Sequence, residues 1–332
     1  MTMDEFWQWL LFALCGGFGG LAVLATLLLR HYRRLTNGRP LAWLRAKLGR
    51  GKNLDELARR LGVAADELRA FETSYKEAFI PKKRGGTRRL LIPDPKLKAM
   101  QRRILKRLLG RLLAHPAARG FEKRTSIVHN AVPHTRQSVV IKLDVVDFFP
   151  TTRAARVDAY FRRVGWNAEC AALLTRLCTH EGGLPQGAPT SPRLSNLVNY
   201  YLDARLAGYM RWRKGAYTRY ADDITLSFPE DYPRRVRGTI RSVRRLARLF
   251  GYTIHVRHKL RVLRRHQQQR VTGLVVNERV QLPRRTRRWL RAVAHRLRTG
   301  RQATLTPAQL EGWHGLVAMI EKQRPAIHSL IS

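Results

Sequence analysis

The sequence predicts an α+β fold with an antiparallel sheet and basic helices, preceded by one N-terminal transmembrane helix. Two β-prone runs flank the adjacent carboxylates Asp222 and Asp223, which predicts a hairpin with an acidic tip. An apolar run that ends at Asp144 predicts a buried strand followed by a third carboxylate. The transmembrane helix is predicted by an uncharged apolar run over residues 6–29.

Composition narrows the class of partner. The chain has 332 residues and 44% hydrophobic content, which is enough for a sizeable folded core. Its 64 Lys and Arg against 23 Asp and Glu give a net charge of +41, which favours nucleic acid, with an anionic membrane surface as the alternative. The 3 cysteines have no metal-like spacing, so we expect no disulfide framework and a cytosolic body.

Residues 1–35 are predicted to form a membrane anchor. Trp7 and Trp9 stand at one edge of the apolar run, as interfacial aromatic residues do. Basic residues that begin at Arg30 follow the other edge, so the positive-inside rule places the rest of the chain in the cytoplasm. A buried core helix is the alternative, whereas a signal peptide would begin with basic residues and have a shorter apolar region.

Residues 36–80 are predicted to be a linker followed by a pair of helices. Leucines at helical spacing follow Asn53, a candidate N-cap, and Gly62 interrupts the pattern before Phe71. This pattern is similar to a helix-turn-helix and leaves a DNA-reading role open. It favours a plain helical hairpin that packs on the next domain.

The next domain, residues 81–280, begins with basic segments and the strand that ends in an acid. Residues 81–93 predict a hairpin, or a loop that enters a short strand, and residues 96–113 predict a helix whose cations track phosphates. Asp144 follows the apolar part of residues 138–150, and we place it in a site because a buried unpaired charge is costly. Phe149 is either a core aromatic residue or packs against a sugar.

The rest of the chain alternates loops, strands and basic helices. Residues 182–196 are a Gly/Pro-dense loop that holds Gln186 on a stiff turn and leads into a helix from Ser191 to Leu206. We expect a helix over residues 233–250, a strand over residues 251–262 that carries Lys259, and another strand over residues 271–277. The last domain, residues 281–332, is predicted to be helical and strongly basic.

The hairpin predicts a metal site. Adjacent strand residues point to opposite faces, so only a turn lets Asp222 and Asp223 approach one site. Paired carboxylates suit a hard cation such as Mg²⁺. The alternative is that turn propensity alone explains the two aspartates. Asp144 supplies the third carboxylate that a metal site needs.

Taken together, these motifs resemble those of a reverse transcriptase, an RNA-directed DNA polymerase, and in particular a bacterial retron reverse transcriptase. The resemblance covers the chain from Asn53 onward and not the apolar N-terminus. The shared motifs, in family order, are residues 88–93 with Gln101, residues 130–134, residues 142–149, residues 184–192, residues 220–223, Lys259 and residues 271–273. The resemblance implies a right-hand polymerase, with fingers and palm in residues 81–280 and a thumb in residues 281–332.

The same resemblance implies which residues hold the metal ions. Asp144 and Asp222 would bind two Mg²⁺ ions, with Asp223 as a weaker ligand and the backbone carbonyl of Val145 as a further one. One ion would lower the pKa of the primer 3′-hydroxyl, and the other would stabilise charge on the leaving pyrophosphate.

Further residues are implied for the nucleotide and for RNA. Arg88 would bind the incoming triphosphate, and Phe149 would exclude a 2′-hydroxyl. Gln186 would contact the nascent pair or the template backbone, whereas Lys259 either acts on the pyrophosphate or only forms a salt bridge. The RNA-binding residues implied by the retron motifs and the basic thumb are Asn130, His134, Val271, Thr272, Gly273, Arg287 and Arg288.

The retron resemblance also implies a substrate and a role. From dNTPs the enzyme would copy part of a structured noncoding RNA into single-stranded DNA, primed by the 2′-hydroxyl of an internal guanosine, to give branched RNA-linked DNA. Host RNase H would remove the template, and an effector protein would act with the complex in anti-phage defence.

The implied location is the bacterial inner membrane, through residues 6–29, with the catalytic domain in the cytoplasm. A cytoplasmic protein is the alternative. Two other functions stay open. One is another bacterial reverse transcriptase, either group II intron-like or defence-associated. The other is a non-catalytic, membrane-tethered RNA-binding protein.

Overall fold

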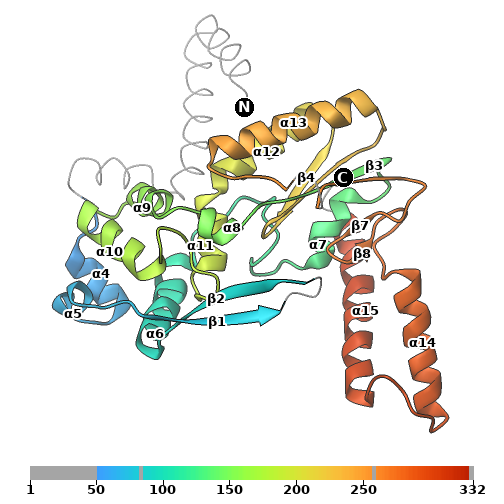
Figure 1. Cartoon of the computed structure of the whole chain (residues 1–332), viewed down its shortest axis with the longest axis horizontal. Coiled ribbons are helices and arrows are strands. Elements are labelled where there is room, and N and C mark those ends of the chain that lie inside the picture. Colours follow the sequence, from blue (N-terminus) through green and yellow to red (C-terminus); the bar gives the residue numbers. More distant parts are fainter. Residues whose placement is uncertain (1–50, 82–84, 256–258, 329–332) are drawn as a thin grey trace, which may run out of the picture. The chain divides into compact units, whose positions relative to one another are not determined.

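The structure is a computed structural model that describes residues 51–81, 85–255 and 259–328 (Figure 1). Its contacts divide the chain into two compact units that are interleaved in sequence. The first unit comprises Met1–His115 with Asp147–Tyr201, and the second comprises Pro116–Val146 with Leu202–Ser332. The segment predicted as one domain, residues 81–280, therefore contributes to both units.

The described residues contain no helix that is long and apolar enough to cross a membrane. The predicted membrane helix over residues 6–29 lies outside these residues, as does the linker up to residue 50. The membrane anchor therefore stays a prediction.

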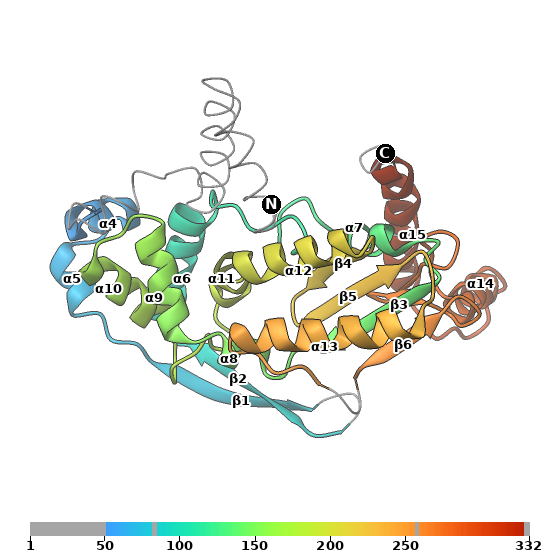
Figure 2. The same cartoon turned by 90° about the horizontal axis from the view of Figure 1, so that it is seen from above.

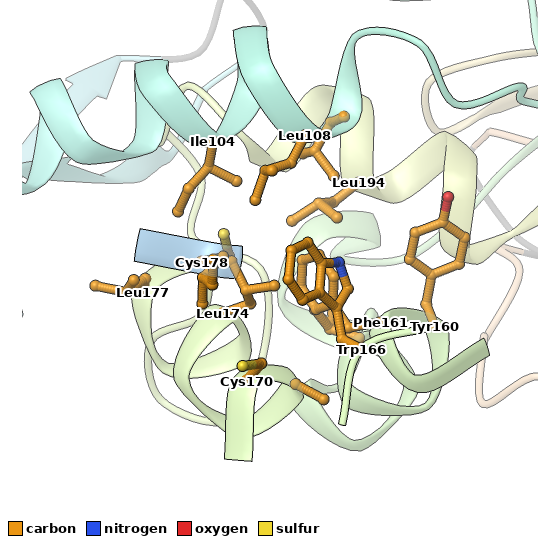
Figure 3. Close-up of a cluster of buried hydrophobic side chains, with 14 of the residues drawn as sticks. Ile104, Leu108, Tyr160, Phe161, Trp166, Cys170, Leu174, Leu177, Cys178 and Leu194 are labelled. Carbon is orange, nitrogen blue, oxygen red and sulfur yellow. The ribbon is translucent and has the colours of Figure 1, made fainter. Parts of the chain in front are cut away.

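The first unit has a helical core. Its helices are α4 (Leu54–Leu61), α5 (Ala65–Arg69), α6 (Pro95–Ile104), a π-helical turn (Leu105–Leu109), α8 (Phe148–Thr151), α9 (Ala154–Arg163), α10 (Ala168–Cys178) and α11 (Ser191–Val198). The Asn53 side chain caps α4 by accepting a hydrogen bond from the Glu56 N–H at 3.1 Å, and Gly62 ends it with a φ of 70°. Buried leucines of α4 and α5 join the core that Figure 3 shows around Trp166. The plain helical hairpin is confirmed, and the helix predicted over residues 96–113 ends at Leu109.

The first unit also contains an antiparallel hairpin of β1 (Tyr75–Pro81) and β2 (Thr87–Pro93). The glutamine loop packs against it, because the Leu91 N–H donates to the Gln186 carbonyl at 2.8 Å. Gly187 approaches the strand so closely that a Cβ there would lie 2.6 Å from the Leu91 carbonyl oxygen. Of the two predictions for residues 81–93, the hairpin is confirmed.

The second unit is built on a four-stranded sheet in the order β4-β5-β3-β6. The strands are β3 (Val139–Asp144), β4 (Ala216–Tyr220), β5 (Asp223–Phe228) and β6 (Arg261–Arg264), and β3 is antiparallel to both β5 and β6. Figure 2 shows α12 (Tyr200–Trp212) and α13 (Pro233–Leu249) side by side along this sheet. The predicted helix over residues 191–206 is split between α11 and α12.

The strand predicted over residues 251–262 is wrong. A single β-bridge joins Ile254 to Val145, and the ladder with β3 begins only at Arg261. The chain crosses the end of β3 at this bridge, where the His255 N–H donates to the Asp144 carbonyl at 2.9 Å. Lys259 therefore stands in a bend before the strand.

A second core of this unit joins a short helix, a small hairpin and two long helices. These elements are α7 (Ile127–Ala131), a 3₁₀ turn (Val132–His134), β7 (Arg270–Val271), β8 (Leu274–Val275), α14 (Arg284–Arg298) and α15 (Pro307–His328). The strand predicted over residues 271–277 is corrected to a hairpin, because Thr272 and Gly273 both have positive φ, 46° and 86°, as in a type I′ turn. The basic helical C-terminus is confirmed, and the Trp289 and Trp313 rings pack edge to face at 5.8 Å.

Candidate active site

Three carboxylates meet at one end of the sheet in the second unit. Tyr220 pairs with Asp223, so β4 and β5 are joined by a two-residue turn of Ala221 and Asp222. Ala221 has a φ of 58°, and a positive φ at the first central residue is the feature of a type II′ turn. Asp144 is the cross-strand partner of Asp223. The predicted hairpin with an acidic tip is confirmed. The strand next to it in the sheet, β3, carries the third predicted carboxylate, Asp144.

The backbone after Asp144 is tied to the same turn. The Val145 N–H donates to the Asp222 carbonyl at 3.1 Å, and the Val146 N–H donates to the Thr253 carbonyl at 2.8 Å. Val145 is buried, so these bonds fix a segment that water cannot easily solvate. The structure thus brings all four predicted metal-binding residues to one place.

Asp144 also has two basic neighbours. The Lys259 Nζ lies 2.6 Å from its Oδ1, and the His255 Nε2 lies 3.6 Å from the same oxygen. The Lys259 side chain is half exposed, whereas that of Asp144 is largely buried. Of the two roles predicted for Lys259, the salt bridge is observed. His255 was not predicted, because its approach depends on the chain crossing the end of β3.

The turn concentrates negative charge. Burial raises the pKa of Asp222, and the charges of Asp144 and Asp223 raise it further. Burial also raises the pKa of Asp223, against the opposing charge of Lys142. These carboxylates repel one another at neutral pH, and a bound cation would relieve that repulsion.

The residues fit a hard divalent cation by their chemistry. Their carboxylate and carbonyl oxygens are the ligands that such ions prefer. Within residues 51–81, 85–255 and 259–328, however, no three His, Cys, Asp or Glu side chains form a ready-made metal site. A cation that binds Asp144 must also compete with the ammonium of Lys259, which already contacts the carboxylate.

A buried ion pair holds the turn between β4 and β5 from behind. Arg219 in β4 and Asp203 in α12 are both fully buried, with Nε to Oδ1 at 2.8 Å and Nη2 to Oδ2 at 2.6 Å. The Tyr217 hydroxyl donates to Asp203 Oδ1 at 2.6 Å. Arg219 Nη1 donates to the Ala221 carbonyl at 3.1 Å, so the same guanidinium reaches the turn itself. This pair was not predicted from the sequence, although an aspartate between the core positions Leu202 and Leu206 is an available signal.

A second segment of backbone supports the turn. The Arg219 N–H donates to the Ala117 carbonyl at 2.8 Å, and the Arg119 N–H donates to the Arg219 carbonyl at 2.7 Å. The chain then passes so close to the turn that a Cβ on Gly120 would lie 2.8 Å from the Ala221 nitrogen. Only glycine fits this approach without a shift of the turn.

Of the four residues predicted to bind the nucleotide, Lys259 lies in the second unit and the other three lie in the first. Arg88 is exposed on β2, whereas its neighbour Arg89 is committed to ion pairs with Glu77 and Glu181. Phe149 in α8 is half buried and packs on the helical core. Gln186 is half buried in the loop that contacts β2. The contacts of these three residues with a nucleotide stay predictions.

Residues 130–134, the first segment that resembles a retron motif, contain two buried side chains that were predicted to bind RNA. His134 has no exposed surface, and its Nδ1 and Nε2 lie 2.7 Å from the Ser227 hydroxyl and 2.8 Å from the Thr218 hydroxyl. Burial lowers the pKa of His134 to about 3, so its ring is neutral at physiological pH. Asn130 is 1% exposed. Direct RNA contacts by these two side chains are not supported by their placement, which is in the core beneath the sheet.

Residues 271–273, the second segment that resembles a retron motif, contact the helix that carries Asn130. The Thr272 hydroxyl donates to the Ile127 carbonyl of α7 at 3.0 Å, and Val271 is buried in the core that α7 joins. Gly273 is exposed at the turn. Arg287 and Arg288 are exposed on α14, where phosphates can reach them. RNA binding by these residues stays a prediction.

Comparison with known proteins agrees with this geometry. The family model for reverse transcriptase (RNA-dependent DNA polymerase) matches residues 80–276. Retron Mx162 reverse transcriptase of Myxococcus xanthus is 35% identical over 312 residues, covering 82% of this chain and 64% of that protein. Retron Mx65 reverse transcriptase of the same organism is 36% identical, covering 81% and 69%. Retron Ec86 reverse transcriptase of Escherichia coli is 30% identical, covering 82% and 85%.

Proposed function

Because this chain belongs to the reverse transcriptases, and within them to the retron type, we propose that it is an RNA-directed DNA polymerase that copies part of a structured noncoding RNA into single-stranded DNA. The observation that carries the proposal is the meeting of Asp144, Asp222 and Asp223 at one end of the sheet. A non-catalytic RNA-binding protein would not require three mutually repelling carboxylates at a buried turn.

The chemistry follows from the positions of the side chains. Two Mg²⁺ ions held by the three carboxylates and the Val145 carbonyl would supply an activated 3′-hydroxyl and charge stabilisation at the pyrophosphate. Arg219 holds the turn that carries Asp222. Lys259, with its half-exposed side chain, can leave Asp144 and take a pyrophosphate oxygen as its partner.

The other proposed nucleotide contacts belong to the first unit. Arg88 binds the triphosphate, since it is exposed and makes no ion pair within the described residues. Phe149 packs against the sugar, and Gln186 contacts the nascent pair or the template. The stiff support of the Gln186 backbone by β2 favours such a role, because a positioned contact orders the substrate before reaction.

The retron type of the relatives supports the finer parts of the proposal. Synthesis begins at the 2′-hydroxyl of an internal guanosine and gives branched RNA-linked DNA. The thumb residues Arg287 and Arg288 bind RNA phosphates. Host RNase H trims the template, and an effector protein acts with the complex in anti-phage defence. Residues 6–29 anchor the chain in the bacterial inner membrane, with the catalytic part in the cytoplasm.

One experiment tests the central proposal. The full chain is expressed with its flanking genomic DNA, and the nucleic acid that co-purifies with it is sequenced across the RNA–DNA junction. A 2′,5′ branch at a guanosine is expected. Primer extension on an RNA template is compared with Asp222→Asn, which should abolish extension, and unchanged extension would refute the mechanism. The anchor fails if a reporter fused to residues 1–40 stays in the soluble fraction.

A further inference from the structure

An open groove lies at the end of the sheet away from the carboxylates. It has a volume of about 650 Å³ and is lined by residues at the end of α12 and the start of α13. Its lining residues are Trp212, Arg213, Lys214, Tyr232, Arg234 and Arg235. Strand β5 is 6 residues long, so the groove stands roughly 17 Å from Asp223 along the strand. A nucleotide at the catalytic turn therefore does not fill it.

The two aromatic rings of the groove are exposed but held in place. Trp212 is 68% exposed and Tyr232 is 55% exposed. The Arg235 guanidinium lies 4.7 Å from the Tyr232 ring centroid and 4.7 Å from that of Phe228. Its Nη2 also donates to the Glu230 carbonyl at 2.7 Å. The Trp212 ring contacts Arg213, whose guanidinium lies 5.5 Å away. Each ring is thus braced by a cation while much of its surface stays accessible.

The charge of the groove is positive and is only partly offset by nearby acids. Four of the six lining residues are cations, and none is an acid. Asp231 pairs with Arg264 at 2.6 Å, outside the groove, whereas Glu230 lies 3.5 Å from the lining residue Arg235 and offsets one of the four cations. Lys214 and Arg234 make no ion pair within the described part of the chain and can contact an anion.

Exposed rings beside unpaired cations in a concave surface suit unpaired nucleotides. Bases stack on aromatic side chains while the backbone phosphates contact Lys and Arg, and every base offers a stacking face. Trp, Tyr and Arg are also enriched in protein interfaces, so the test below must separate a protein partner from RNA. In a double helix the bases are paired and stacked on one another, so it could contact the cations of the groove but not stack on its aromatic rings.

We propose that this groove binds an unpaired segment of the RNA that the enzyme copies, outside the catalytic centre. The choice of RNA rests on the proposed function. The groove would hold the RNA while its copied part moves through the active site, so template release and extension would be separate events. Trp212 and Tyr232 carry the stacking, and Lys214 and Arg234 carry the phosphate contacts.

The test measures binding of a short fluorescent oligouridylate RNA that contains 5-iodouridine, without dNTPs and with a saturating primer–template duplex. Photocrosslinks mapped by mass spectrometry should fall on Trp212 or Tyr232. The variant Trp212→Ala with Tyr232→Ala should bind at least about fivefold more weakly, since stacking contributes ~1–3 kcal/mol per base. Leu249→Ala, which removes another exposed apolar side chain on α13, is the control and should bind as the parent does.

A matched pair of charge variants tests the phosphate contacts. Lys214→Gln with Arg234→Gln should weaken binding and flatten its salt dependence. Arg245→Gln with Arg248→Gln removes the same charge from exposed positions farther along α13 and should change binding less. Equal effects of the two charge variants would overturn the proposal, as would crosslinks absent from both rings. If a groove variant binds RNA normally but loses a protein that co-purifies with the parent, the groove binds that protein and the proposal is wrong. Because binding is measured without synthesis, failure of the polymerase assay leaves this result intact.

Discussion

The ion pair behind the catalytic turn offers the sharpest test of how the site is held. Arg219 contacts both Asp203 and the Ala221 carbonyl, so it is either a core ion pair alone or a support for the turn. The two roles separate in a variant that replaces the whole network with apolar groups, Arg219→Met with Asp203→Leu and Tyr217→Phe. This variant removes the charges of Arg219 and Asp203 and the hydroxyl of Tyr217 together, so none of these three side chains keeps an unpaired buried polar group.

The expected magnitudes differ between the single and triple variants. Arg219→Met alone leaves Asp203 buried without its cation and should lower the free energy of unfolding by about 3–5 kcal/mol. Apolar replacement of a complete buried pair is often neutral, or stabilising by about 1–4 kcal/mol, so the triple variant should recover that stability. It does not recover the bond to Ala221, a charged hydrogen bond worth roughly 1.5–3 kcal/mol. Ala221 then loses one of the contacts that hold its positive φ.

Urea denaturation and primer extension on an RNA template are measured for parent, single and triple variants. We expect stability near that of the parent for the triple variant but a kcat lower by about 100-fold, because a displacement of ~1 Å at a catalytic group has that effect. The KM for dNTP should change little, since the substrate contacts are elsewhere. Full recovery of both stability and kcat would refute the support role and leave the pair as packing alone. Arg219→Lys is a further control, since one ammonium cannot reproduce the two-pronged contact with Asp203.

Three more predictions concern the surroundings of the turn. Lys259→Gln removes the ammonium that contacts Asp144, so a divalent cation should bind the protein more tightly by calorimetry, and unchanged affinity would contradict the competition. His134→Gln should flatten the acid dependence of stability. In the parent, only the unfolded chain binds a proton at this histidine between pH 6.5 and about 3, so the free energy of unfolding falls by up to ~1.4 kcal/mol per pH unit as the pH is lowered. If urea denaturation gives the parent and the variant the same dependence of this free energy on pH, the prediction is wrong. Gly120→Ala should reduce primer extension because its Cβ would lie 2.8 Å from the Ala221 nitrogen, whereas Gly208→Ala in α12, with no atom within 4 Å, should leave extension unchanged.

The elements that were predicted correctly are those whose pattern of apolar and polar residues lies within one short segment of the sequence. The hairpin at Asp222 and Asp223, the strand that ends at Asp144 and the basic helix α13 follow from period-two and helical patterns. The strand predicted over residues 251–262 failed because β-prone composition does not say where pairing begins. The segment over residues 271–277 failed because Thr272 takes a positive φ that β-branched residues rarely adopt.

The parts that were missed depend on contacts between distant segments. Asp203 and Arg219 are 16 positions apart on a helix and a strand, and no periodicity predicts that they meet. Gly120 approaches Ala221 across about a hundred residues of sequence. The burial of His134 was missed for the same reason, since a motif resemblance gives a position in the chain and not its depth in the fold.

The buried ion pair of Asp203 and Arg219 also suggests why a charge lies in the core beside the acidic turn. A buried ion pair rarely stabilises a fold more than apolar side chains of similar volume would. This chain has 23 acids against 64 bases, yet one acid lies fully buried behind the catalytic turn. That placement is easier to understand if the guanidinium is needed at the Ala221 carbonyl, because Asp203 then compensates the charge that the turn requires. Burial raises the pKa of Asp222, and repulsion from Asp144 and Asp223 raises it further; that repulsion acts on the same turn, so the turn must be held from behind against it. The ion pair and the carboxylates are therefore two parts of one arrangement, in which a core contact holds the turn of a mutually repelling group of acids.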